Sequence, residues 1–245
     1  MNEIVIRGVT CLPGEGEGFT GLDADLTGRR LVGVVAEVEE SAILLLRIIA
    51  GLHKPAAGDI LYDSSEIYAM NDDDRSKLIR RNSYIFDSGG LVSNLSVLEN
   101  ISLPYDFVEI EATEEEKMAG IKEFLTLFGV EETILERRPS MLNKSEIKIV
   151  NYIRAFVIDP EVAFIELPFS RLNKTNEKKL EEFLVHRSFN NRKTHIFATQ
   201  RYSKLLEMAD AVIAIRKNTA IYFPRDEGGK ATFDYQQFFE NQENI

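Results

Sequence analysis

Residues 31–52 read LVGVVAEVEESAILLLRIIAGL, and this stretch decides the fold class. Its first part, residues 31–35, is a continuous run of apolar and β-branched residues, which is typical of a strand buried on both faces of a parallel sheet. Its second part, residues 44–52, repeats leucine and isoleucine at helical spacing, and Gly51 stands where a helix commonly ends. A strand, a tight turn and a buried helix in this order form the unit on which phosphate-binding loops are built.

Strand-like and helix-like patterns alternate along the rest of the chain. Short apolar or alternating segments predict further strands at 4–9, 22–26, 162–165, 194–198, 211–215 and 220–223. Helical spacing dominates a middle block from about 95 to 150, most clearly at 111–129, and returns at 177–186. This alternation indicates an α/β fold with a helical insertion. We expect one domain over residues 1–225, with a helical subdomain inserted at about 93–150, and a polar C-terminal tail at 226–245.

Composition excludes several classes of protein. The chain has 245 residues and a net charge of −11, which argues against a protein that wraps nucleic acid and needs a basic face. Its one cysteine, Cys11, cannot form an internal disulfide and fits a reducing cytoplasm. The N-terminus lacks the pattern of a secretory signal, and no run approaches the ~20 apolar residues that span a bilayer. We therefore expect membrane contact only through a protein partner.

A series of segments resembles the motifs of ATP-binding-cassette (ABC) nucleotide-binding subunits, in the family's order and spacing. Residues 31–52 resemble the strand and helix around the Walker A loop. Residues 85–91 and 95–100 resemble the Q-loop and the helix after it, and residues 154–160 resemble the end of the signature helix. Residues 166–173 resemble Walker B with the D-loop, and residues 198–210 resemble the switch region. The resemblance implies a P-loop NTPase-like cassette with an antiparallel N-terminal sheet and an inserted helical subdomain. Residues 91–104 most resemble cassettes of lipid-trafficking and lipoprotein-release transporters.

The phosphate-binding loop itself has been replaced. Such a loop needs the pattern G-x-x-x-x-G-K-[ST], because its glycines let backbone N–H groups face the phosphates, its lysine binds them, and its hydroxyl ligates Mg²⁺. The corresponding window is residues 36–43. Here Ala36 and Ser41 replace the glycines, Ala42 replaces the lysine and Ile43 replaces the hydroxyl. These substitutions predict that ATP does not bind in the ordinary way.

Three acidic residues of this window, Glu37, Glu39 and Glu40, lie where a polyanion would bind. Two like charges ~4 Å apart near a protein surface repel by roughly 4 kcal/mol, which strengthens the prediction against ATP binding. Two interpretations of these residues remain open. They are a solvated loop at the start of a helix, where the helix dipole favours acids, or one carboxylate fills the vacated phosphate site.

The other catalytic positions of the family are also substituted. By resemblance, Glu166 replaces the Walker B aspartate, Leu167 the catalytic glutamate, and Gln200 the switch histidine, while Asp87 replaces the Q-loop glutamine. The signature motif loses both glycines and reads Leu142, Asn143, Lys144, Ser145 and Glu146. Because phosphoryl transfer depends on positioning and charge neutralisation, these changes leave no plausible route to hydrolysis.

These features predict a catalytically inactive cassette subunit that acts as a structural or regulatory partner of a membrane permease or of another cassette. It would lie in the cytoplasm, peripheral on the inner face of the cell membrane, and need no cofactor or metal. One alternative is a divergent ATP-binding or ATPase subunit that works with a competent cassette, and another is an interaction module without a transporter. The resemblance places the permease-docking groove at Asp87, Ser88, Gly89, Gly90, Leu91 and Leu103.

Overall fold

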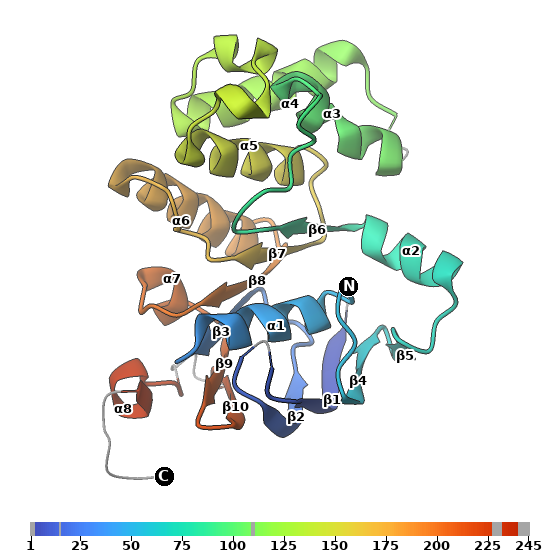
Figure 1. Cartoon of the computed structure of the whole chain (residues 1–245), viewed down its shortest axis with the longest axis vertical. Helices are drawn as coiled ribbons and strands as arrows, with labels where there is room; N and C mark the ends of the chain where they lie inside the picture. The colour runs from blue at the N-terminus through green and yellow to red at the C-terminus, as the bar shows by residue number, and fades with distance from the viewer. Residues whose placement is uncertain (1–2, 15, 109–110, 227–231, 240–245) are drawn as a thin grey trace.

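The computed structural model describes residues 3–14, 16–108, 111–226 and 232–239, and in them two sheets lie below a layer of helices (Figure 1). The smaller sheet is antiparallel with strand order β2-β1-β4-β5. Its strands are β1 (Ile4–Cys11), β2 (Phe19–Asp25), β4 (Ala57–Tyr62) and β5 (Ser65–Glu66). Side chains alternate between buried and more exposed along much of β1 and β2, as expected for a sheet with one face on the core.

The larger sheet has the strand order β10-β9-β3-β8-β7-β6. All its pairs are parallel except β9 with β10. The central strand, β3 (Leu31–Ala36), is buried along its whole length, which confirms the prediction from its apolar run. The other strands are β6 (Asn82–Ile85), β7 (Val162–Glu166), β8 (Thr194–Thr199), β9 (Ala211–Arg216) and β10 (Thr219–Pro224).

Helix α1 (Glu39–Ile49) packs in the apolar core formed with the two sheets. Its leucines and isoleucines are almost all buried, because they recur on the faces turned toward both sheets. Gly51 adopts a positive φ of 75° just beyond the helix end, a backbone conformation that glycine tolerates best. The helix begins at Glu39, five residues before the apolar repeat that predicted it, because residues 39–43 carry no glycine and continue the helical turn.

The middle block forms a helical subdomain, as predicted, and this subdomain packs against the large sheet through α5 (Lys144–Phe156) and β6. Helix α4 (Glu114–Phe128) starts with a capping box between Thr113 and Glu116 and ends at Gly129 in the left-handed conformation. A second apolar core joins these helices to the sheet. The other elements of the subdomain are α3 (Val97–Val108), η1 (Glu132–Glu136) and η2 (Pro139–Met141).

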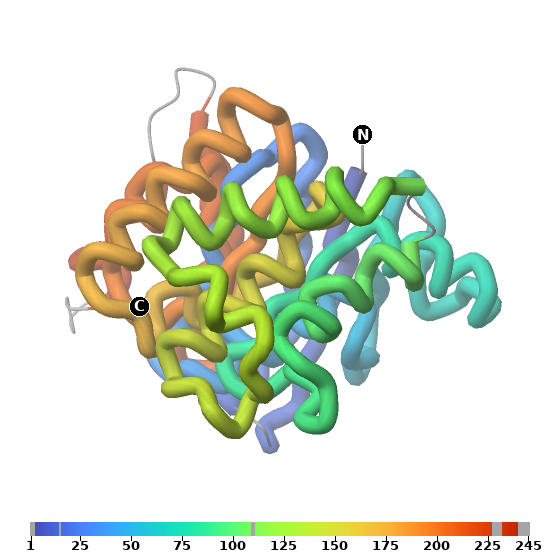
Figure 2. Tube along the Cα trace, turned by 90° about the horizontal axis from the view of Figure 1, so that it is seen from above, coloured from blue at the N-terminus to red at the C-terminus, as the bar shows by residue number. Residues whose placement is uncertain are grey.

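The remaining helices lie beside this stack, as the view from above shows (Figure 2). Helix α2 (Asp72–Arg80), in teal, lies at one side of the molecule, and α6 (Lys174–Phe189), in orange, lies at the other. The N-cap of α2 is Asn71, whose side chain accepts the Asp74 amide, and the aspartates at 72–74 fill the first turn.

The C-terminal segment differs from the predicted polar tail. Residues 232–239 include α8 (Tyr235–Phe239), and Phe238 is buried in the second core, where its ring packs 5.7 Å from that of Phe223. The cause is a group of aromatic side chains that the overall polarity of the segment concealed. Residues 227–231 and 240–245 of the predicted tail lie outside the described residues. A last short helix, α7 (Lys204–Glu207), follows β8.

Within the described residues, every helix is too short or too polar to cross a membrane.

Candidate functional site

The replaced phosphate-binding window lies at the carboxyl end of β3. Ala36 ends the strand, residues 37–38 form a bend, and the rest of the window belongs to the first turns of α1. Glu39 and Glu40 are in the first helical turn, where the helix dipole favours acids, so the first of the two interpretations of these glutamates describes their position. Ala42 is fully buried and Ile43 is partly buried, and both side chains pack from α1 into the first apolar core.

The loop between β1 and β2 lies directly on this helix start. A Cβ atom on Gly16 would meet the Ser41 amide nitrogen at 2.8 Å and the Ser41 Oγ at 2.6 Å. The backbone amide of Glu17 donates to the Ser41 Oγ at 2.7 Å. The Ser41 amide in turn donates to the carbonyl oxygen of Val38 at 3.0 Å. The chain's own backbone, rather than the carboxylate of our second interpretation, therefore lies against the amide of the substituted glycine position.

Neighbouring groups fix the bend before α1. The side-chain amide of Gln200 donates to the carbonyl oxygen of Glu37 at 2.7 Å, and the Glu37 carboxylate lies 3.5 Å from the Arg216 guanidinium. The pKa of Glu39 is raised by partial burial and then by the negative charges of Asp87 and Glu40. This carboxyl group therefore lies in an acidic environment that disfavours a second anion.

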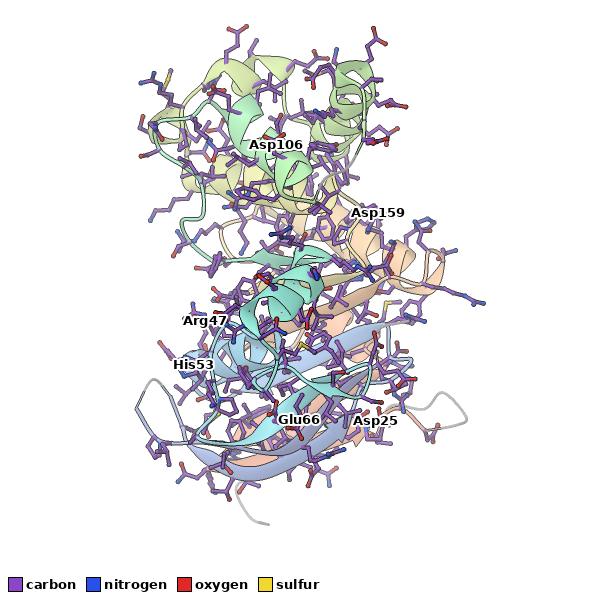
Figure 3. All side chains as sticks on the ribbon, turned by 90° about the vertical axis from the view of Figure 1, so that its right-hand side faces the viewer. Asp25, Arg47, His53, Glu66, Asp106 and Asp159 are labelled. Atoms are coloured by element: carbon purple, nitrogen blue, oxygen red, sulfur yellow. The ribbon has the colours of Figure 1, made fainter. Side chains whose placement is uncertain are left out.

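The carboxylate of Glu166 is surrounded by donors from the protein. Arg47 Nε lies 2.9 Å from Oε1, the Tyr84 hydroxyl donates to the same oxygen at 2.8 Å, and the Asp87 amide donates to Oε2 at 3.0 Å. The Glu166 side chain is only 3% exposed, whereas that of Arg47 is 39% exposed. Figure 3 labels Arg47, which lies in the part of the molecule that holds the sheets, whereas Asp106 lies among the helices above. The carboxylate at the Walker B position is thus neutralised internally.

Asp87 continues this network toward the helical subdomain. Its carboxylate lies 3.5 Å from Lys148 Nζ and 2.9 Å from the Arg171 guanidinium, and it accepts the hydroxyl of Ser170. Partial burial opposes these contacts, but together they hold the pKa of Asp87 below its usual value. We expected Asp87 to line a docking groove. Its side chain is instead directed to this internal cluster.

Lys148 is the buried cation of the network. Its side chain is fully buried in α5, and its Nζ also donates to the backbone carbonyl of Glu166 at 2.9 Å. Burial lowers the pKa of Lys148 to about 8, and the charge of Asp87 limits that fall. Leu167, directly after Glu166, has a positive φ of 44°, and its amide donates to the carbonyl of Ala198. By the resemblance, Leu167 is expected at the position of the family's catalytic glutamate, and its side chain is apolar.

The residues at the signature position form an ordinary helix start. Asn143 caps α5 by accepting the amides of Ser145 and Glu146, and the Glu146 carboxylate accepts the Asn143 amide in return. Leu142 packs against the second core, and Lys144 begins the helix. The structure therefore places these residues at a capping box, away from the network around Glu166.

The predicted docking residues follow β6. Ser88, Gly89 and Gly90 are exposed, and Leu91 and Leu103 are partly buried. A groove of about 220 Å³ opens nearby between the large sheet and the subdomain. Its lining includes Tyr84, Pro104, Phe107, Val108 and Arg154. The exposed rings of Phe107 and Phe86 make this part of the surface apolar.

The family resemblance implies a magnesium-bound nucleotide, and the residues present do not fit one. The Glu166 carboxylate that could bind a metal already contacts a guanidinium and two hydrogen-bond donors. The amide at Ser41 is covered by Gly16. The side chains of Ala42 and Ile43 offer neither a positive charge nor an oxygen ligand.

Sequence reasoning identified Asp87 and Glu166 but missed the cations that neutralise them. Arg47 and Lys148 each interrupt an otherwise apolar stretch of a helix, at LLLRII and IKIV. Because charged residues are rarely buried without a partner, a lone cation in such a stretch is a signal of a buried ion pair. No comparable pattern in the sequence indicated that Gly16 would cover the Ser41 amide.

Comparison with known proteins supports the resemblance. The family model described as "ABC transporter" matches residues 44–170. A probable sulfate/thiosulfate import ATP-binding protein CysA from Chlorella vulgaris is 24% identical over 218 residues, which are 89% of each protein. A sulfate/thiosulfate import ATP-binding protein CysA from Caulobacter vibrioides is 29% identical over 221 residues. That match covers 89% of this chain but 63% of the relative, so the chain spans less than two thirds of that protein.

Solved structures confirm the fold. A dimeric post-hydrolysis state of the ATP-binding cassette MJ0796, bound to ADP and phosphate, superposes with a TM-score of 0.77 at 20% identity and covers 90% of this chain and 98% of the other. A structure titled as the ATP-binding subunit of an ABC transporter gives a TM-score of 0.76 at 15% identity and covers 97% of this chain and 98% of the other. The α/β cassette with an antiparallel sheet and a helical subdomain is therefore the observed fold.

Proposed function

Because the chain belongs to the ABC transporter family, we propose that it is an ATP-binding-cassette subunit that does not hydrolyse ATP and that acts as a structural or regulatory partner of a membrane permease. The observation that carries this proposal is the contact between Arg47 and Glu166. A carboxylate that already pairs with a guanidinium at 2.9 Å and accepts two further hydrogen bonds is a poor ligand for a divalent cation.

The start of α1 supports the same proposal. Three glutamates, a missing lysine and the covering loop at Gly16 all disfavour a bound polyphosphate there. Electrostatic repulsion alone, at roughly 4 kcal/mol for one close pair of charges, corresponds to about three orders of magnitude in affinity.

A second candidate is a divergent ATP-binding or ATPase subunit that works with a competent cassette. The names of the relatives favour it over the inactive subunit, since both proteins from Chlorella and Caulobacter are called ATP-binding proteins. Those relatives are called sulfate/thiosulfate import ATP-binding proteins. The resemblance of residues 91–104 to lipid-trafficking cassettes is a separate proposal with only that segment in its support.

Docking on a permease would use the groove near β6 and α3. Its lining combines apolar side chains with Arg154, whose guanidinium donates to the carbonyl of Gly90. Exposed Phe86 and Phe107 give this surface the apolar centre that is usual in protein interfaces. We propose that the chain reaches the membrane through this contact.

Thermal unfolding with and without Mg-ATP tests the proposal against its rival. A site filled to 100 times its dissociation constant adds about 2.7 kcal/mol, which for a chain of this size raises the midpoint by roughly 5–10 °C. We expect no shift for this chain beside a clear shift for an intact cassette. A magnesium-dependent shift of this size would contradict the proposal of an inactive cassette subunit and favour the ATP-binding subunit.

A further inference from the structure

The Glu166 carboxylate contacts groups from several separate elements of the fold. Arg47 reaches it from α1, Tyr84 from β6, and the Asp87 amide from the loop after β6, while Glu166 itself ends β7. Since the carboxylate is almost fully buried, its charge requires these donors, and a missing donor would leave it uncompensated. Arg47 supplies the only full positive charge in this set of donors.

We propose that Arg47 is a positioning residue: a cation tethered to α1 that serves as the permanent counter-ion of Glu166 and thereby holds the loop at residues 87–91 in one arrangement without any nucleotide. The inference rests on the proposed function, because it gives the substituted site an internal cation in place of a bound metal. The pKa of Arg47 is raised by its hydrogen bond to Glu166 and by that residue's charge, although desolvation opposes the rise.

The loop at residues 87–91 is held from its other side by one face of α5. Lys148 Nζ lies 3.5 Å from the Asp87 carboxylate, the Asn151 side chain donates to the carbonyl of Gly89 at 2.9 Å, and Arg154 donates to that of Gly90. Residues 148, 151 and 154 follow one another at a spacing of three and therefore share this face of the helix. The loop is thus fixed between Glu166 and the helical subdomain.

This arrangement has a consequence for binding. Phe86 and Val92 flank the loop and are 37% and 41% exposed, and Phe86 is part of the apolar surface that we propose for docking. If Arg47 holds the loop, this surface is already ordered in the free chain, and a partner need not order it on binding. The preorganised surface would make docking independent of nucleotide.

Hydrogen exchange followed by mass spectrometry tests the role of Arg47 in the full chain without nucleotide. The test variant is Arg47→Ala, and the matched control is Arg75→Ala, which removes an exposed pair with Asp72. We expect Arg47→Ala to speed exchange in peptides covering residues 84–92 roughly tenfold or more, since the Asp87 amide loses its fixed acceptor. Arg75→Ala should leave these peptides unchanged. Equal exchange in Arg47→Ala and the parent chain would overturn the proposal.

Two further measurements separate positioning by charge from simple packing. Arg47→Lys keeps the charge and should restore part of the protection. Free guanidinium at sub-denaturing concentration should restore part of it to Arg47→Ala, because the side chain that it replaces is 39% exposed. If Arg47→Ala speeds exchange along the whole chain, the restoration of protection by Arg47→Lys and by guanidinium still tests the proposal. Failure of both would overturn the proposal.

The outcome is independent of the test with Mg-ATP. If the parent chain binds Mg-ATP and Arg47→Ala still loosens residues 84–92, the proposed function fails while the role of Arg47 stands. If the chain binds no nucleotide and Arg47→Ala has no effect, the proposed function stands and Arg47 is an ordinary ion pair.

Discussion

Lys148 places an amine in the interior of the molecule, beside α5 and the loop after β6. It donates to the carbonyl of Glu166 and lies close to Asp87, yet burial lowers its pKa from 10.5 to about 8. Because the pKa of Lys148 is lower in the folded chain than in the unfolded chain, burial of the charged amine destabilises the folded state. The single contact with Asp87 offsets only part of the desolvation.

The titration of Lys148 predicts how stability depends on pH. Between about pH 8 and 10 the unfolded chain binds more protons at this position than the folded chain does, so stability rises as the pH rises. The cost of burying the charge is fully present below pH 8 and is relieved above it. We expect this group alone to add about 2 kcal/mol over that interval. Urea unfolding of the parent chain and of Lys148→Met at a series of pH values measures it.

The comparison isolates Lys148 from the tyrosines, which also titrate in alkali. Lys178→Met, which removes an exposed lysine paired with Glu182, serves as the control and should keep the pH dependence of the parent chain. If Lys148→Met shows the same rise between pH 8 and 10 as the parent chain, the amine is not the group responsible.

At the scale of elements, the start of α1 decides what the chain can bind. The helix begins at Glu39, and the loop between β1 and β2 packs its Gly16 on the Ser41 amide. A phosphate-binding loop needs backbone N–H groups that face outward to an anion. Here the first turn combines acidic side chains with a backbone cover, so the defect belongs to the whole element and not to one residue.

We therefore expect that restoring the two missing side chains will not restore nucleotide binding. The double variant Ala42→Lys with Ile43→Ser returns the lysine and hydroxyl of the phosphate-binding pattern. Since Gly16 still covers Ser41 and Arg47 still neutralises Glu166, titration calorimetry with Mg-ATP should detect no binding.

Ala42 is fully buried, so the new lysine will also lower stability. Circular dichroism must first establish that the double variant is folded. Binding of Mg-ATP by the folded double variant would mean that the lost side chains, and not the arrangement of the elements, prevent binding in the parent chain.

At the scale of the whole molecule, a groove lies between the large sheet and the helical subdomain, and exposed apolar side chains lie at it. Phe107 on α3 is 65% exposed at this groove. Such a ring contributes little to the folded state, so its replacement changes stability by roughly 0.5 kcal/mol or less.

We predict that Phe107→Asp abolishes co-purification with integral membrane proteins from detergent-solubilised membranes while the unfolding midpoint stays nearly unchanged. A carboxylate in an apolar contact would have to be desolvated without a partner. The control is Phe189→Asp, since Phe189 is 43% exposed at the end of α6 and does not line this groove. Equal recovery of membrane proteins with both variants would argue against docking through the groove.

Much of the candidate site could be located from the sequence, but its contacts could not. The pattern of residues 31–52 located the substituted window, and the spacing of later segments located Asp87, Glu166 and Gln200. None of this placed the Arg47 guanidinium on Glu166, since the two residues are 119 positions apart. Such a pair depends on how α1 packs against β7, which no local pattern encodes.

The sequence by itself determined the fold class, because the period of apolar residues fixes which segments become buried strands and which become helices. Through the family resemblance it also predicted which side chains of a nucleotide site are missing. Only the tertiary structure decided that the β1–β2 loop covers Ser41, that cations from α1 and α5 neutralise the two carboxylates, and that aromatic residues hold segment 232–239 to the core. These contacts join residues far apart in the chain, and their energies depend on burial, which exists only once the elements have packed.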